Sequence, residues 1–470
     1  MMTMGNFQLS KQVDPNNIFL VKFSELEGRF DPNTYHPIRC DAISKIMNSK
    51  FNYQRLGDLS NFSKTIIKHI DNDIYIGLEN IESNTGVFLK SKEKENISSA
   101  VVFKKRQVLF PKLRPYLNKV HYANFNGVCS TEFHVLDSKC LDNKFLAYFL
   151  SLDIVVRQTT LLMSGNTLPR LQTEDIKNLL VVTPPKNIQV SIVKKMDKAY
   201  QNKKDREAQA QNLLNSIDDY LLDELGIEPP KEIDNSLKAR IFTKKLSEVA
   251  SGRFDAEYYQ KKYINFENAL INKGEYVLLK KILQILESGS RPTGGVGNIE
   301  SGVLSFGGTH VSSDGYIDTS KAKYIPIEYH QKNLATATKI DDLLLVKDGA
   351  TTGKIAIIQK AEHENQNINE HVFLMRLKDS VNPIYLLSYL KSSFGNMQIK
   401  REITGATVTG LTKDVVNTLK IPLPPLEKQN QIAKHIGNIR KQAKQLQTEA
   451  KTGLEQAKQE IETMILREKL

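Results

Sequence analysis

Two long polar stretches of the chain carry apolar side chains at helical spacing. Within residues 426–470 the apolar or small positions follow one another in steps of four and three, which is the heptad pattern of a helix that packs along another helix. Residues 187–228 show the same pattern, interrupted by a polar middle. At about 1.5 Å per residue, each helix would be roughly 60 Å long. Two such seams at equivalent places favour mutual pairing over two separate amphipathic surface helices.

The seam positions that we expect to pair the helices and to support subunit docking are apolar in both stretches. They are Ile188, Ile192, Met196, Leu213, Ile217, Ile432, Ile436, Ile439, Leu446, Leu454 and Ile461.

The pattern changes before each long stretch. Residues 1–186 and 240–424 contain short β-branched and aromatic runs, such as VVFKKRQVLF and HVFLMRLK, separated by turn sequences such as SNTG and SSDG. A helical run follows the strands in each block, FLAYFLSL in the first and IYLLSYLKSS in the second. We therefore predict a mixed α+β fold, in the order globular domain, long helix, globular domain, long helix.

The chain also repeats itself. SELEGRFDPNTYHP near the start matches SEVASGRFDAEYYQ, VLFPKLRPYLNKV matches LLLVKDGATTGKI, and GNTLPRLQTEDIKNLLVVTPP matches GATVTGLTKDVVNTLKIPLPP. The order is the same in both copies, and each copy ends on a proline pair that interrupts regular structure before the long helix. An internal duplication with pseudo-twofold symmetry explains this order.

Composition narrows the partners and the compartment. The 470 residues are 40% hydrophobic and 25% charged, and 65 Lys and Arg against 53 Asp and Glu give a formal net charge of +12. This excess favours a polyanionic partner or an acidic membrane surface. The three cysteines, Cys40, Cys129 and Cys140, argue for a reducing compartment. The N-terminus lacks signal-peptide features and no apolar stretch is long enough to span a bilayer, so we expect a cytoplasmic protein.

The tandem plan, the Pro-Pro boundaries, the Gly-Arg-Phe-Asp starts and the GATTGK loop together resemble the specificity subunit of type I restriction–modification systems. The resemblance covers essentially the whole chain. It implies two target-recognition domains, each reading one half of a split site in double-stranded DNA. It further implies that the two long helices pair as an antiparallel coiled coil, set the spacing of the domains and dock two methyltransferase (modification) subunits.

The same resemblance implies that the chemistry resides in partners. One or two restriction subunits, with an ATP-driven translocase and a nuclease, would join the methyltransferase core. S-adenosylmethionine, ATP and Mg²⁺ would then be bound by those subunits, and this chain would bind no cofactor. We therefore expect a non-catalytic recognition and scaffolding subunit that reads an asymmetric site, because the loops of the two copies differ.

Candidate DNA-binding residues must lie on loops that recur between the copies and must be able to bond phosphates or base edges. The first domain supplies Lys112, Arg114, Tyr116, Asn118, Lys119, Ser130, Thr131, Glu132, Asn166 and Arg170. The second supplies Arg291, Lys347, Thr351, Thr352, Lys354, Asn369, Glu370, His371, Arg401 and Thr407. Arg29 and Arg253, with Asp31 and Asp255, recur in both copies, which favours a structural salt bridge or subunit docking.

Catalytic motifs are weak in this sequence. Gly349–Lys354 has three residues between its glycines where a P-loop has four, and Ile355 stands where a P-loop has Ser or Thr. Asn382-Pro383-Ile384-Tyr385 departs from the Asn-Pro-Pro-Tyr motif of amino-methyltransferases at its third residue. No Cys or His spacing suggests a metal site. The alternatives are a self-contained restriction or modification enzyme with a divergent centre, and a coiled-coil adaptor unconnected to DNA.

Overall fold

The computed structural model describes thirteen stretches of the chain. They are residues 13–14, 16–26, 31–63, 65–68, 74–90, 97, 99–163, 167–230, 236–249, 253–293, 295–296, 299–405 and 409–467. The chain divides into two compact units. Unit 1 is Met1–Glu207 with Gln447–Leu470, and unit 2 is Ala208–Leu446.

Unit 1 is built on two four-stranded sheets with helices on one side. The first sheet has the order β2-β9-β6-β7 and the second β3-β5-β8-β4. Their strands are β2 (Ser60–Ser63), β9 (Phe133–Ser138), β6 (Val108–Pro111), β7 (His121–Tyr122), β3 (Ile66–Ile67), β5 (Ala100–Phe103), β8 (Gly127–Cys129) and β4 (Tyr75–Ile76). The helices are α1 (Pro37–Met47), α2 (Leu56–Leu59), α3 (Asn143–Leu150), α4 (Asp153–Thr159) and α5 (Thr173–Lys177). A short antiparallel pair joins β1 (Tyr53–Arg55) to β10 (Leu180–Val182).

Unit 2 repeats this plan with other residues. Its main sheet has the order β12-β18-β15-β16 and its second sheet β14-β13-β17. Their strands are β12 (Leu283–Ser288), β18 (Val372–Leu377), β15 (Leu343–Val346), β16 (Ile355–Ile357), β14 (Tyr324–Ile325), β13 (Val303–Phe306) and β17 (Asn367–Ile368). The pair β11 (Val277–Leu278) and β19 (Lys420–Ile421) corresponds to β1 and β10. The helices are α9 (Lys261–Lys273), α10 (Ile327–Gln331), α11 (Pro383–Lys391), α12 (Ser393–Glu402) and α13 (Lys413–Asn417).

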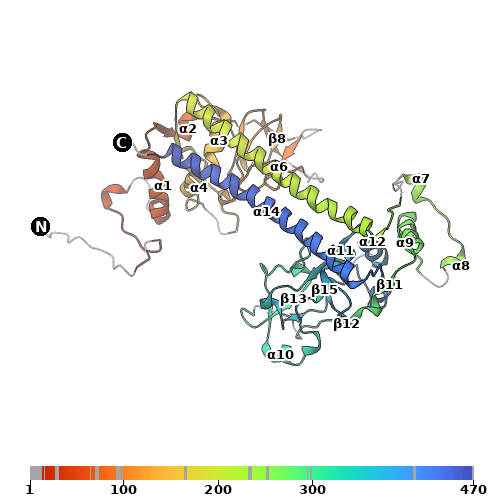
Figure 1. The fold of residues 1–470 in the computed structure, drawn as a ribbon. Coiled ribbons are helices and arrows are strands. Elements are labelled where there is room, and N and C mark those ends of the chain that lie inside the picture. The colour runs from red at the N-terminus through yellow and green to blue at the C-terminus, as the bar shows by residue number, and fades with distance from the viewer. Residues whose placement is uncertain are drawn as a thin grey trace. The chain divides into compact units, whose positions relative to one another are not determined.

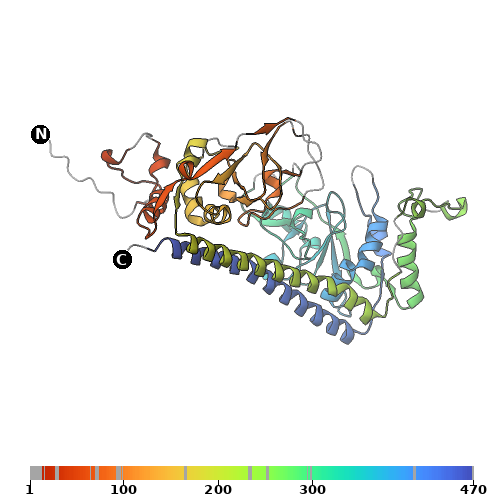
Figure 2. The same cartoon turned by 90° about the horizontal axis from the view of Figure 1, so that it is seen from above.

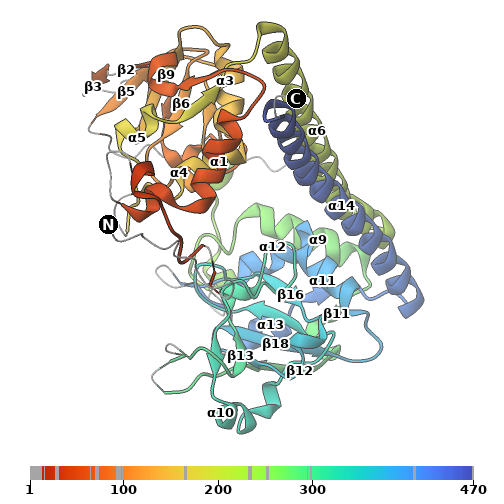
Figure 3. The ribbon, with the colours of Figure 1, turned by 90° about the vertical axis from the view of Figure 1, so that its left-hand side faces the viewer.

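Alternation along the central strands separates two cores in each unit. In β15, Leu343 and Leu345 face the core that holds α11, whereas Leu344 and Val346 face the second sheet. Unit 1 shows the same alternation in β6, where Val108 points to the helical side and the next residue to the second sheet. Figure 3 shows α11 and α12 on one side of the unit 2 sheet. The main sheet therefore has helices on one face and a small sheet on the other.

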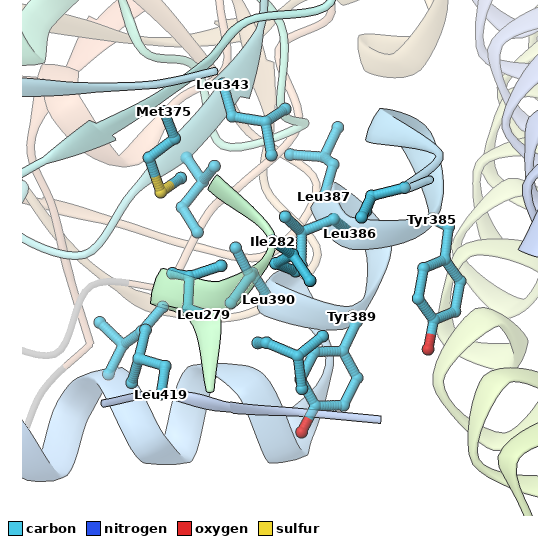
Figure 4. Packing of buried hydrophobic residues seen from close by; sticks show 14 of the residues in the cluster. Leu279, Ile282, Leu343, Met375, Tyr385, Leu386, Leu387, Tyr389, Leu390 and Leu419 are labelled. Atoms are coloured by element: carbon cyan, nitrogen blue, oxygen red, sulfur yellow. The ribbon is translucent and has the colours of Figure 1, made fainter. Parts of the chain in front are cut away.

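The helical core of unit 2 is tightly filled. Figure 4 shows Leu343 and Met375 of the sheet beside Leu386 and Leu387 of α11, all completely buried. Tyr385 is also fully buried, and its hydroxyl donates to the carbonyl of Pro422 at 2.6 Å. The one polar atom of this large side chain is thus satisfied inside the core.

The two long helices are α6 (Lys186–Leu225) and α14 (Leu426–Ile465), against predicted ranges of 187–228 and 426–470. Each contributes one half to each unit, so the compact units divide the chain differently from the four predicted segments. Within each unit the halves run antiparallel and lie side by side (Figures 1 and 2). Ion pairs between the helices fix this direction, Lys195 with Glu460 in unit 1 and Lys428 with Glu224 in unit 2.

The seam of the long helices enters the core of each unit. In unit 1 the core includes Ile192, Met196, Leu454 and Ile461, with Ile188 partly buried against it. In unit 2 the core includes three of the predicted positions, and the other three lie along the seam outside this core. The core positions are Ile432, Ile436 and, partly buried, Ile217, and the others are Ile439 (buried) with Leu213 and Leu446 (half-buried).

A pair of equivalent glutamines fastens the start of each long helix to its own domain. Gln189 accepts from the backbone N–H of Asp142 and donates to the carbonyl of Pro184, both at 2.9 Å. Gln429 accepts from the N–H of Asn382 at 2.9 Å and donates to the carbonyl of Pro424 at 2.8 Å. The duplication inferred from the sequence therefore extends to individual hydrogen bonds.

Arg253 has a structural role in unit 2. Its guanidinium bonds Asp255 at 2.6 Å and donates to the carbonyls of Arg401 and Ile403 at 3.2 and 3.0 Å. This agrees with the salt bridge predicted for the repeated Gly-Arg-Phe-Asp segment. The matching Arg29 lies outside the described residues. Among the helices of the described ranges, none combines the length and apolarity that a bilayer crossing requires.

Candidate nucleic-acid interface

The predicted loops of each unit are held by the same backbone hydrogen bonds. In unit 1 the N–H of Lys112, directly after β6, donates to the carbonyl of Glu132 at 2.8 Å, and the carbonyl of Lys112 accepts from Leu171 at 3.0 Å. In unit 2 the N–H of Lys347, directly after β15, donates to His371 at 2.9 Å. Its carbonyl accepts from the Leu411 N–H at 2.7 Å. Three loops that are distant in sequence therefore meet beside the main sheet in both units.

In unit 2 two of these loops, those that hold Lys347 and His371, border an open groove of about 410 Å³. Four of the predicted residues line it, namely Arg291, Thr351, Asn369 and His371. The groove also contains the backbone of Gly307, Gly308 and Gly349, which brings main-chain donors to its wall. Residues from five separate segments thus converge on one concave surface, which is the form expected of a binding site.

Acidic and basic side chains face one another at this groove. Arg291 forms an ion pair with Glu370 at 2.6 Å, and the Nε2 atom of His371 lies 3.2 Å from the same carboxylate. The Nδ1 atom of His371 contacts the carboxylate of Asp348. These side chains are half-exposed, so a ligand can exchange for the internal partners. Arginine, histidine and carboxylates in such a groove can bond phosphates and base edges.

The loop after β15 is a tight hairpin and not a P-loop. It joins β15 to β16, which pair antiparallel, whereas a P-loop leads from a strand into a helix. Gly349 and Gly353 have φ of 93° and 88°, in the left-handed region that favours glycine. The Thr352 hydroxyl donates to the carbonyl of Gly349 at 2.6 Å and therefore braces the turn. Lys354, at the end of this loop, is exposed and is not among the groove residues.

The equivalent loop of unit 1 has a different surface. Arg114 and Tyr116 are exposed, and Arg114 adopts a left-handed backbone conformation with φ of 49°. Arg170 forms a forked ion pair with Glu132, with nitrogen–oxygen distances of 3.0 to 3.2 Å. Ser130 and Thr131 are half-buried beside this pair. Unit 1 therefore presents Arg114, an aromatic ring and a forked ion pair, whereas unit 2 presents a histidine, an arginine and two carboxylates.

Three predicted DNA-binding residues have partners inside their own unit. Asn118 is buried, and its amide donates to the carbonyl of Ser151 at 2.8 Å. Lys119 donates to the carbonyl of Leu78 at 2.7 Å and is half-buried. Arg401 forms an ion pair with Glu267 at 2.5 Å, and its guanidinium lies 4.3 Å from the centre of a tyrosine ring. Each of the three therefore makes at least one side-chain bond within its unit. Asn166 and Thr407 lie outside the described residues.

The sequence interpretation missed groove residues that the fold brings in from a neighbouring turn. The 3-10 turn Gly308–His310 follows β13 and places Thr309 and His310 at the groove. Lys323, directly before β14, also lines it, and its carbonyl accepts from the N–H of Ser305 in β13 at 2.8 Å. His310 is buried: its Nδ1 accepts from the N–H of Gly307 at 3.0 Å and its Nε2 bonds the carbonyl of Lys321 at 3.1 Å. Burial lowers the pKa of His310, so the ring is a neutral part of the wall. The repeat carried a signal, because a polar residue follows a glycine by three positions in both copies. In unit 1 this residue is Asn80, which accepts from the N–H of Gly77 at 2.8 Å.

Asn382 of the Asn-Pro-Ile-Tyr sequence is a helix cap. Its side chain accepts from the N–H of Tyr385 at 2.9 Å at the start of α11, and its amide donates to Asn430 at 2.8 Å. Asp142 caps α3 in the same way in unit 1, accepting from Lys144 and Phe145. A side chain used as a cap explains why the position is polar in both copies.

Comparison with known proteins agrees with this duplicated architecture. The family model described as the type I restriction modification DNA specificity domain matches residues 48–216 and 309–456. These two segments cover more than half of the chain, one in each copy of the repeat. The chain therefore belongs to the family of type I restriction–modification DNA specificity domains, as the resemblance in the sequence had indicated.

Individual relatives are more distant. The EcoDI specificity subunit of Escherichia coli is 26% identical over 189 residues, which are 39% of this chain and 42% of the relative. The MjaVIII specificity subunit of Methanocaldococcus jannaschii is 32% identical over 130 residues, 24% of this chain and 27% of the relative. The chain thus spans less than half the length of these curated relatives.

A solved chain has the same fold. It comes from structures describing complex assembly and conformational transition of a type I restriction–modification system. Its TM-score is 0.53 at 19% identity, over 89% of this chain and 97% of that chain.

Proposed function

We propose that this chain is the sequence-specific DNA-binding subunit of a type I restriction–modification complex. Each unit reads one half of a bipartite, asymmetric site in double-stranded DNA. The predicted loop residues contact the duplex, and the formal net charge of +12 supplies phosphate contacts that do not depend on sequence. Family membership is the first support for this proposal.

The observation that carries the proposal is the shared loop scaffold with exchanged side chains. Lys112 and Lys347 occupy the same position in the same backbone hydrogen-bond pattern, so each can serve as a phosphate contact that fixes register. Beside them the polar groups differ, with Glu132 and Arg170 in unit 1 and His371 in unit 2. Equivalent positions with different donors and acceptors suit two half-sites of different sequence.

The proposal places methylation and cleavage in partner subunits. Two methyltransferase subunits and one or two restriction subunits would assemble on this chain and bind S-adenosylmethionine, ATP and Mg²⁺. Two features support a recognition role: the GATTGK loop is a hairpin, and Asn382 is occupied as a helix cap. The rival function, a self-contained enzyme, requires the purified chain alone to methylate or cut DNA with those cofactors. We expect neither reaction.

Methylome mapping tests the proposal directly. The chain and its methyltransferase subunit are expressed together in a host without other adenine methylation, and methylated adenines are mapped across the genome. We expect a two-part motif with a fixed gap. Replacing residues 240–424 by the matching block of a related subunit should change one half of the motif and leave the other half unaltered. A change in both halves, or in neither, contradicts one domain per half-site.

A further inference from the structure

A short apolar segment precedes the Gly-Arg-Phe-Asp sequence in each copy of the repeat. The first arm, residues 16–26, contains Ile18-Phe19 and, three residues later, Phe23-Ser24-Glu25-Leu26. The second arm, residues 236–249, contains Ile241-Phe242 and, three residues later, Leu246-Ser247-Glu248-Val249. A lysine stands directly before Phe23 and before Leu246. The two arms therefore share the pattern Ile-Phe-x-x-Lys-(Phe/Leu)-Ser-Glu-(Leu/Val).

The two arms also share local structure. Phe23–Glu25 form a 3-10 turn, closed by the N–H of Leu26 donating to the carbonyl of Phe23 at 3.3 Å. Leu246–Val249 form the single turn α8, preceded by α7 (Leu237–Arg240) in the segment that leads to α9 (Figure 1). The turn lies at the same place in the shared pattern, so the resemblance of the arms extends from sequence to backbone.

One aromatic residue of the first arm attaches it to its own unit. The Phe19 ring lies 5.6 Å from the ring of His36 in a T-shaped contact, and His36 also bonds the carbonyl of Asn16 at 2.9 Å. Phe242, at the matching position of the second arm, is half-buried, and Lys244 lies 5.7 Å from the centre of the Tyr259 ring. The arms are therefore anchored through part of their length.

Two further apolar positions of the shared pattern face solvent, while the last one, Leu26 or Val249, is half-buried. Ile18 is 54% exposed and Phe23 84%, and the matching Ile241 and Leu246 are 77% and 74% exposed. A single exposed apolar residue needs no explanation, but exposed apolar groups that gather on one surface mark interaction sites. Here the same two positions are apolar and exposed twice, on copies whose loops have otherwise diverged. A pair of exposed apolar side chains that is present once in each copy indicates a partner that binds once to each copy.

We propose that the two arms are docking sites for two copies of one protein, the modification subunit, each inserting the Ile18–Phe23 or the Ile241–Leu246 pair into an apolar pocket. This inference rests on the proposed function, which supplies a partner present in two copies. Duplex DNA does not suit these positions, because its surface is a row of phosphates and the side chains in question are uncharged. The long-helix seam is not available for the same purpose where it is buried, since Ile192 and Ile436 are at most 1% exposed.

Binding stoichiometry tests the arms. The full chain is mixed with its modification subunit, and bound copies are counted by light scattering after size exclusion, with affinity measured by calorimetry. One variant carries Ile18→Asp with Phe23→Asp, a second carries Ile241→Asp with Leu246→Asp, and a third carries all four changes. Since all four side chains are exposed, circular dichroism and melting should be unchanged.

We expect the wild-type chain to bind two modification subunits. Each two-residue variant should bind one subunit normally and the second at least about tenfold more weakly, and the four-residue variant should bind both weakly. The matched control is Ile327→Asp with Leu334→Asp, which are 55% and 54% exposed in unit 2 and have no place in the shared pattern. It should bind two subunits as the wild type does.

A photo-crosslinking amino acid at position 23 or 246 supplies a second readout and should crosslink the modification subunit, while one at position 327 should not. If the four-residue variant bound two subunits at unchanged affinity, the docking role of the arms would be refuted and the proposed function would still hold. A wild-type chain that binds no modification subunit would overturn both. Loss of DNA binding or of self-association in the arm variants, with subunit binding intact, would also refute the inference, because it would assign the arms to another occupant.

Discussion

Unit 1 and unit 2 keep the same main-chain contacts while their exposed side chains differ. The N–H of Lys112 donates to Glu132 in unit 1, and the N–H of Lys347 donates to His371 in unit 2. The two acceptors are carbonyls of a glutamate and a histidine, yet the bonds are 2.8 and 2.9 Å long. Main-chain bonds do not depend on side-chain identity. Loops of this kind can therefore exchange their reading groups without loss of the scaffold.

The long helices differ from the loops because they use side chains to hold their place. Gln189 and Gln429 each satisfy one main-chain donor and one main-chain acceptor at the junction of helix and domain. A side chain that makes both of these hydrogen bonds is difficult to replace, since its loss would leave both main-chain partners without a hydrogen bond. The comparison teaches that the junctions are fixed by side chains and the proposed DNA-binding loops by main chain.

The largest effect should come from placing a charge in the matched helix seams. Met196 in unit 1 and Ile436 in unit 2 are both fully buried. Met196→Asp and Ile436→Asp each lose an apolar group and bury a carboxylate, and each should lower the free energy of unfolding of its own unit by about 3–5 kcal/mol. Hydrogen exchange of each unit, read by mass spectrometry, measures this. The exposed Val190→Asp on α6 is the control, and equal loss of protection in both units would contradict the expectation.

The second effect is a pH dependence of stability that should be present in unit 1 and absent from unit 2. Lys458 of α14 donates to the carbonyl of Asn84 at 2.5 Å, and it also lies 3.3 Å from the carbonyl of Ser151. Burial lowers the pKa of Lys458 to about 8, from an ordinary value of 10.5. At the matching position of unit 2, Asp218 accepts from the N–H of Ser393 at 2.9 Å. Only the stability of unit 1 should therefore depend on the protonation of Lys458.

The sign of the pH effect follows from proton binding. Between about pH 8 and 10.5 the unfolded chain holds the Lys458 proton while the folded chain releases it, so the contribution of this lysine to stability rises with pH. Because the side chain is only half-buried, we expect a reduced effect: relative to Lys458→Met, the wild type should gain about 1–2 kcal/mol between about pH 7.5 and 9.5. Urea unfolding of unit 1 measures the difference. Lys451→Met, exposed on the same helix, should show no such trend.

The third effect tests whether the junctions are equivalent. Gln189→Ala and Gln429→Ala each leave a main-chain N–H without its acceptor, and each should cost about 1–3 kcal/mol. The urea midpoint of unit 1 should fall for the first variant and that of unit 2 for the second, by similar amounts. Gln201→Ala, exposed on α6, is the control. A large shift in one unit and none in the other would show that the duplicated junctions have diverged in function.

Much of the fold could be predicted from the sequence because it depends on periodicity. The steps of four and three through Ile432, Ile436 and Ile461 require a helix with one buried side, and α14 is that helix. The repeat likewise predicted two similar α+β domains. The division of each long helix between two units was missed, because a heptad seam shows that a helix has a partner and does not say which domain lies over each half.

The candidate site was predicted less completely, for a physical reason. Arg291 and His371 were selected on residue type and repeat position, and the fold brings them to one groove. Asn118 and Arg401 satisfied the same criteria, yet their side chains bond groups inside their own units. Residue type sets what a side chain can bond, but only the packed structure determines whether an internal partner already occupies it. His310 was missed because it acts through burial beside the groove.

The smallest effect should come from the lysines that the two scaffolds hold in equivalent positions. Lys112→Ala and Lys347→Ala each remove one proposed phosphate contact, so each should weaken binding a few-fold for every duplex sequence. Each should also lower the slope of log affinity against log salt by about 0.9. Fluorescence anisotropy with a duplex, over a range of salt concentrations, measures both quantities for the complex with the methyltransferase subunit. Lys451→Ala, on the exposed face of α14, is the control. If one of the two substitutions lowers the slope and the other does not, then the shared main-chain scaffold does not place both lysines in contact with phosphates.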